Sequence, residues 1–257
     1  MNTKEFRIDF SESFEQLPAA PSVEAIIHWR ARAGRTLEPD TFQRVLIEKL
    51  PEYPSQQRQQ EFRVGGEFGP EGSHVEHKQT WQGYRFQSSD NRNIAQFTRN
   101  GFVFSRLSPY QDWTKFEAEA LRLWRIYCDL AEPSEIQRLG VRFINAIAVE
   151  TLDQLPGLLV LPPASPSAMG LPIQEFMHQT RYSISDYGYS LNVIQTIQPP
   201  SADDENLKLI LDLDVFTEDT VEMAEEVLRK RLAEMRWIKN KAFFSILTPE
   251  AIGRFKE

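Results

Sequence analysis

Six segments of this chain alternate apolar and polar residues or are rich in β-branched and aromatic residues, which is typical of β-strands that bury one face. The segment from 207 to 216, LKLILDLDVF, is the clearest, because every odd position in it is apolar. A pattern repeated this often predicts a sheet with one face against a core. The other segments are 23–32, 61–68, 77–86, 138–149 and the region from 179 to 198.

The stretch NIAQFTRNGFVFSRL predicts a β-hairpin. It contains Asn100-Gly101 between alternating flanks, which is the strongest short signal for a two-residue turn. A turn centred on this dipeptide would pair Phe97 with Phe104 across the hairpin.

Two segments repeat apolar residues with the helical period instead. In residues 113–133, Thr114 and Glu117 have the spacing of a capping box, and Pro133 follows the predicted end. The second helix is predicted within residues 219–244, where glutamates come early and lysine and arginine come late, as the helix dipole favours.

The order of these elements repeats along the chain. Residues 1–133 and residues 134–257 each run from a strand through a helical or irregular stretch into several strands and then into a long helix. We therefore expect an α+β fold in which an extended antiparallel sheet carries the long helices on one face. The repeat predicts an internal duplication of a β-α-β(n)-α unit, similar in outline to the saddle of the TATA-box-binding protein. Short linkers predict that both halves form one compact unit.

Charge restricts the classes of function. The 257 residues include 29 Lys and Arg against 37 Asp and Glu, a formal net charge of -8, and neither half is basic. Nucleic acid is therefore disfavoured as a partner, because binding a phosphate backbone needs an excess of clustered cations. We find no run of about 18 apolar residues and no apolar core of a signal peptide near the N-terminus, so we expect a cytoplasmic protein without a membrane segment.

The alternating strands direct their charged residues to one side, opposite the apolar side. Opposite charges on neighbouring strands pair for roughly 0.2–1 kcal/mol each, so one interpretation is a set of ion pairs that serves only the fold. The other is a polar surface that binds a partner or a small anion. Both interpretations predict that an aspartate of 207–216 lies within ion-pair distance of an arginine of 138–149. The charged members are Glu24, Arg30, Arg32, Arg138, Arg142, Asp212 and Asp214.

Asn145 breaks the alternation, because it falls on the apolar side of its strand. A buried amide needs partners, so it is either satisfied by a neighbouring backbone edge or faces a pocket, and we favour the first. A metal site is disfavoured, because Asp212 and Asp214 supply too few oxygen ligands and His74 and His77 would need two more. We expect neither a metal nor a cofactor, since the chain also lacks a glycine-rich phosphate loop and a nucleophile elbow.

Four stretches follow one another in a characteristic order: APSVEAIIHWRAR, RLGVRFINAI, LILDLDVF and KNKAFFSILTPE. With this order and these separations, the chain resembles a sporadically distributed family of bacterial conserved hypothetical proteins of about this length. The family has no established reaction, so the resemblance implies no catalytic residue. Its patchy occurrence implies accessory genes, such as defence or toxin-antitoxin modules.

Two functions from different classes fit these observations. The first is a non-catalytic interaction or regulatory protein that holds a protein partner, either through the mixed-charge sheet face, with Glu24, Arg30 and Asn145 among its residues, or through an exposed C-terminus. The second is an enzyme or small-ligand binder that acts on an anionic substrate at the arginines and aspartates. A general acid or base needs a pKa displaced toward neutrality, and we expect the arginines to counter such a shift at Asp212 and Asp214. We therefore favour the non-catalytic function, with an unknown oligomeric state.

Overall fold

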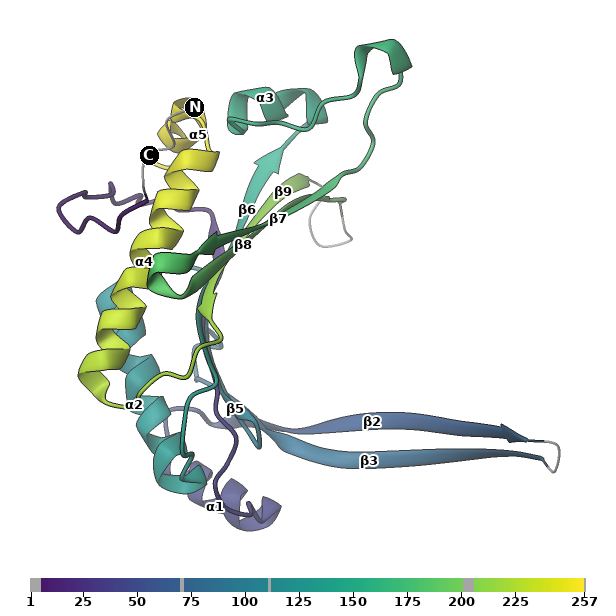
Figure 1. Cartoon of the computed structure of the whole chain (residues 1–257), viewed down its shortest axis with the longest axis vertical. Coiled ribbons are helices and arrows are strands. Elements are labelled where there is room, and N and C mark those ends of the chain that lie inside the picture. Colours follow the sequence, from purple (N-terminus) through teal and green to yellow (C-terminus); the bar gives the residue numbers. More distant parts are fainter. Residues whose placement is uncertain (1–5, 70–71, 111, 201–205, 257) are drawn as a thin grey trace. The chain divides into compact units, whose positions relative to one another are not determined.

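Each of the six segments predicted as strands contains or lies within a strand (Figure 1), although 23–32 extends past the end of its strand and 179–198 also includes a short 3-10 helix. The structure is a computed structural model that describes residues 6–69, 72–110, 112–200 and 206–256, and for 63–69 and 72–78 it describes the backbone alone. The described strands are β1 (Ser22–Arg30), β2 (Ser55–Gly69), β3 (Gly72–Gln87), β4 (Asn93–Thr98), β5 (Gly101–Leu107), β6 (Arg138–Val149), β7 (Met177–Ile184), β8 (Tyr189–Gln198) and β9 (Leu207–Thr217).

Helices occupy much of the remaining described chain. None of them has the length and apolar character needed to cross a membrane. The α-helices are α1 (Pro39–Lys49), α2 (Trp113–Ala131), α3 (Leu155–Leu158), α4 (Glu225–Ile246) and α5 (Pro249–Gly253), and the short 3-10 helices are η1 (Leu152–Gln154), η2 (Ser167–Met169) and η3 (Ser185–Tyr187). The predicted α+β class with an antiparallel sheet is confirmed, whereas the internal duplication stays a prediction.

The chain divides into two units, which we describe separately. Unit 1 comprises residues 1–27, 107–111 and 138–257, and unit 2 comprises residues 28–106 and 112–137. Strand β1 contributes to both, because the chain passes from unit 1 into unit 2 after Ile27. The N-terminal residues are therefore grouped with the C-terminal half of the sequence.

Unit 1 contains hydrogen-bonded strands in the order β1-β6-β9-β8-β7. Strands β6, β9, β8 and β7 are antiparallel to their neighbours, and the register sets Phe143 opposite Leu213. Helix α4 packs on β6 and β9, where the Lys239 ammonium lies 3.9 Å from the centre of the Phe143 ring. Because side chains alternate along a strand, the charged residues at even positions of β6 and β9 point away from α4.

Unit 2 contains hydrogen-bonded strands in the order β2-β3-β4-β5-β1. Its core is aromatic: Trp124 of α2 stacks on Trp29 of β1 with ring centres 5.3 Å apart. The Tyr127 hydroxyl, on the same helix, donates a hydrogen bond to the carbonyl oxygen of Ala31 at 2.7 Å. The apolar stripe predicted for this helix thus packs against the sheet of its own unit.

The hairpin of β4 and β5 forms as predicted, but the predicted register is wrong. Phe97 pairs with Phe102, so the turn precedes Gly101 instead of containing it. Gly101 has a φ of +145°, and a Cβ there would lie 1.9 Å from the carbonyl oxygen of Trp29. The glycine is therefore required by the close approach of β1 and not by the turn.

Two predicted helix starts are also wrong. Helix α2 begins at Trp113, and its N-cap is Asp112, whose carboxylate accepts a hydrogen bond from the Lys115 amide at 2.8 Å. The predicted capping box at Thr114 lies inside the helix, because Asp112 already supplies the acceptor in an extended backbone. Helix α4 begins at Glu225, later than predicted.

Candidate functional site

The polar side of unit 1 consists of side chains from four neighbouring strands, because alternate residues of each strand point to the same side of the sheet. The register sets Arg142 of β6 opposite Asp214 of β9, Asp214 opposite Asn192 of β8, and Asn192 opposite Arg181 of β7. The next cross-strand row consists of Ile144, Asp212, Ile194 and Gln179. We call these two rows, together with Arg138, the paired-charge face.

Both aspartates of this face bind arginines. Arg142 reaches Asp212 with two nitrogens, Nε to Oδ1 at 2.8 Å and Nη2 to Oδ2 at 2.5 Å. Arg138 Nη2 lies 2.9 Å from Asp214 Oδ2. The predicted ion pairs between these strands are therefore confirmed. The Asp212 side chain is 9% exposed and that of Arg142 is 40% exposed, so the carboxylate is the buried partner.

Phe216 of β9 lies beside the arginines at one end of the face. The guanidinium of Arg138 is 4.2 Å from the centre of the Phe216 ring, and that of Arg181 is 4.9 Å from it. A planar guanidinium stacks favourably on an aromatic ring, and this contact restricts the rotation of the arginine side chain. The ring thus helps to position Arg138 for its bond to Asp214.

Asp214 has the less satisfied carboxylate of the two. Within the described part of the chain its Oδ1 is buried and has no hydrogen-bond partner. Burial raises the pKa of Asp214 above its usual value, although Arg138 acts in the opposite direction. Our expectation that the arginines would prevent such a shift is wrong for this residue, because its loss of hydration outweighs their attraction.

Asn145 lies within unit 1 but not on the paired-charge face. Its amide nitrogen donates to the carbonyl oxygen of Leu211 at 3.0 Å, and its amide oxygen accepts from the Ser22 hydroxyl at 2.8 Å. The predicted satisfaction by a neighbouring backbone edge is confirmed. The amide joins three strands of the core and is not available to a ligand.

The two predicted site residues of β1 lie in different units. Glu24 belongs to unit 1. The hydrogen bonds that Arg142 donates to Asp212 raise the pKa of Arg142, and the charge of Glu24 adds to this effect. Arg30 is exposed and belongs to unit 2, whereas the ion-paired residues of the paired-charge face belong to unit 1.

Metal ligands do not gather in the described residues, which contain no group of three His, Cys, Asp or Glu side chains placed to hold an ion. The side chains of His74 and His77 lie outside the described part.

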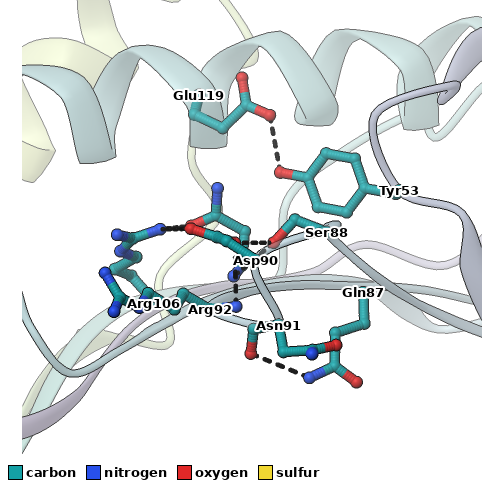
Figure 2. A network of polar contacts seen from close by, with 9 residues as sticks. Tyr53, Gln87, Ser88, Asp90, Asn91, Arg92, Arg106 and Glu119 are labelled. Atoms are coloured by element: carbon teal, nitrogen blue, oxygen red, sulfur yellow. Dashed lines mark hydrogen bonds and ion pairs between the residues drawn. The ribbon is translucent and has the colours of Figure 1, made fainter.

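The sequence did not indicate a second polar network, which lies in unit 2. The Tyr53 hydroxyl donates to Glu119 Oε1 at 2.7 Å (Figure 2), and Arg122 binds the same carboxylate through two nitrogens, each at 2.8 Å. Burial raises the pKa of Tyr53, and the Glu119 anion raises it further. The tyrosine therefore stays protonated, and the bond fastens the segment after α1 to α2.

Asp90 organises the turn between β3 and β4 (Figure 2). Its Oδ1 accepts from the Ser88 hydroxyl at 2.5 Å and from the Arg92 amide at 3.1 Å, and its Oδ2 lies 3.3 Å from Arg106 Nη1. Ser, Asp and Asn are common turn residues, and Asn91 adopts a positive φ of 58°. The sequence Ser-x-Asp-Asn could therefore have predicted this turn. We assign both parts of the network a structural role.

A cavity of about 730 Å³ lies in unit 2, and none of the seven predicted site residues belongs to its described lining. Its lining comes from residues 32–37, from the turn between β4 and β5, and from β2 and β3. Three arginines, Arg32, Arg35 and Arg99, belong to this lining. The sequence placed only Arg32 among the charged residues of interest.

No protein-family model matches this chain, and a search of curated proteins found no match either.

Proposed function

We propose that this protein is a non-catalytic interaction or regulatory protein that binds a protein partner at the paired-charge face. The observation that carries the proposal is the pairing itself: Arg142 with Asp212 and Arg138 with Asp214 at 2.5 to 2.9 Å. Charges that neutralise one another across a sheet offer little to a reacting substrate. They leave a polar surface that a protein can cover without an unpaired charge at its centre.

Isoleucines beside the ion pairs support the same proposal. Ile144 and Ile194 lie on the face in the row of Asp212, and both are half-buried instead of enclosed. Apolar side chains next to arginines and satisfied polar groups are typical of protein interfaces. A partner that covers these isoleucines would gain their remaining apolar surface.

The resemblance to an accessory family extends this proposal. The partner would be a product of the same defence or toxin-antitoxin module and would meet this protein in the cytoplasm. We further propose that the two halves arose by duplication. In support, the first strand of each half lies beside the last strand before its helix: β1 beside β5, and β6 beside β9.

A catalytic alternative is favoured by one residue. Asp214 combines a raised pKa with a buried oxygen that has no hydrogen-bond partner in the described chain. Such a carboxyl group could donate a proton to an anionic substrate that the arginines hold, or accept a proton from it.

A substitution on the face tests the main proposal without breaking either ion pair. Ile194→Arg adds a charge within the row of Asp212, and because Ile194 is only half-buried the variant is expected to fold. A partner is first identified by affinity capture from the native host, and its binding is then measured with both proteins purified. We expect Ile194→Arg to weaken binding at least tenfold, because a partner would have to bury the added charge.

Ile47→Arg is the matched control, because Ile47 lies on α1 of unit 2 and is 45% exposed. Its affinity should equal that of the parent protein. Equal binding by both variants would rule out the paired-charge face as the interface. If the pure protein instead hydrolyses a phosphate ester, and Asp214→Asn abolishes that activity at an unchanged melting temperature, the catalytic alternative replaces the proposal.

A further inference from the structure

We propose that the cavity of unit 2 binds a small organic molecule that carries a phosphate group. This site is independent of the proposed partner surface, since no residue of the paired-charge face lines it. We call it the arginine cavity. The lining residues used below are Arg32, Arg35, Glu61, Trp81, Gln82 and Arg99.

Hydrogen bonds between three backbone segments hold the walls of the arginine cavity. The amides of Ala31 and Ala33 donate to the carbonyl oxygens of Asn100 and Arg99, each at 3.0 Å. Arg32 lies between these two alanines, so the hydrogen bonds on either side of it hold its Cα in place. The Arg99 amide in turn donates to a carbonyl oxygen of β3 at 2.9 Å. A site held in this way loses little entropy when a ligand binds.

The charges at the arginine cavity favour an anion. In the described part of the chain, neither Arg32 nor Arg99 has a side-chain hydrogen bond or ion pair, and both are exposed. Arg35 pairs with Glu132 at 2.9 Å, but the two side chains are 51% and 62% exposed, so the pair is weak and can be exchanged.

Among the described lining residues, the single carboxylate is already engaged. Glu61 Oε2 accepts a hydrogen bond from the Gln82 amide at 2.6 Å. The described lining therefore contains three arginines and one carboxylate. A bound anion would supply the missing counter-charge.

The number of guanidiniums and the volume indicate a phosphate ester. A phosphate group carries nearly two negative charges at neutral pH and three acceptor oxygens, which match two unpaired guanidiniums better than one carboxylate does. A volume of about 730 Å³ exceeds what a free phosphate fills and lies in the range of pockets for organic ligands. Trp81, packed against Phe42 and Tyr84 with ring centres 6.0 and 5.7 Å away, offers a fixed aromatic wall for the organic part.

Titration calorimetry on the full chain tests the arginine cavity. The probes are inorganic pyrophosphate, ribose 5-phosphate and ADP, with adenosine as the uncharged comparison. We expect at least one phosphorylated probe to bind with a Kd below about 1 mM and adenosine not to bind. Arg32→Gln and Arg99→Gln should each lower the affinity at least tenfold, because each removes a charged donor to the phosphate.

Arg44→Gln is the matched control. Arg44 is exposed on α1 and does not line the cavity, so its loss changes the net charge equally and should leave the affinity unchanged. Melting temperatures verify that all three variants fold. The proposal is overturned if no phosphorylated probe binds, or if Arg32→Gln and Arg99→Gln bind as the parent does. It is also overturned if a single-stranded oligonucleotide binds and the small probes do not.

Discussion

Lys239 of α4 illustrates what burial does to a single charged residue. Burial, together with the nearby charge of Arg236, lowers the pKa of Lys239 from 10.5 to about 7. At a pH between these two pKa values, Lys239 holds a proton in the unfolded chain and has released it in the folded chain. Lys239 therefore makes the free energy of unfolding rise as the pH rises through this window, by up to about 1.4 kcal/mol per pH unit.

Lys239→Met should remove this dependence. We expect the variant to be more stable than the parent at pH 7 and below, where the parent must bury a charge, and to lose its advantage as the pH approaches 10.5. Urea unfolding between pH 6.5 and 9.5 measures the difference. Lys230→Met, at an exposed position of the same helix, should follow the parent protein at every pH. An unchanged slope for Lys239→Met would show that Lys239 stays charged in the folded protein.

At the scale of elements, the hairpin of β4 and β5 is constrained by β1. Gly101→Ala would bring a Cβ to 1.9 Å from the Trp29 carbonyl oxygen at a backbone φ of +145°. Both the clash with backbone and the unfavourable φ oppose folding. We expect a loss of stability on the order of 3 kcal/mol in urea unfolding.

Asn100→Ala separates this cause from turn propensity. Asn100 is exposed in the turn, and its carbonyl oxygen, which accepts from Ala31, is kept in the variant. Its cost should stay below about 1 kcal/mol. Comparable losses at both positions would mean that the turn, and not the approach of β1, requires the Asn-Gly dipeptide.

At the scale of the whole molecule, the connectivity predicts a single unfolding transition. The chain passes between the units after residues 27, 106, 111 and 137, so neither unit is a continuous segment. The Asn145 amide oxygen in unit 1 depends on Ser22, far away in sequence, and a buried polar group without its partner costs about 1–3 kcal/mol. Calorimetry and circular dichroism should report one common midpoint. Two separate transitions, or a folded fragment 134–257, would contradict this expectation.

The sequence by itself determined the strands and their faces. A sheet that buries one side forces apolar residues to alternate with polar ones, so the pattern is local and can be read without a structure. The same parity placed Arg138, Arg142, Asp212 and Asp214 on one side, and pairs between neighbouring strands followed from it. Parity also placed Asn145 on the apolar side of its strand. Because a buried amide must be hydrogen-bonded, a neighbouring backbone edge could be predicted as its partner.

Only the tertiary structure decided the rest. The bond between Tyr53 and Glu119 and the lining of the arginine cavity join residues that are distant along the chain. The hairpin of β4 and β5 is local, but its Gly101 is required by the backbone of β1, which is distant in sequence. The alternation of residues does not show which carboxylate becomes buried and loses its hydration. The ion pair of Asp214 could therefore be predicted, whereas its raised pKa could not. Alternation specifies the direction of a side chain, whereas burial, register and cavities depend on which other segments pack against it.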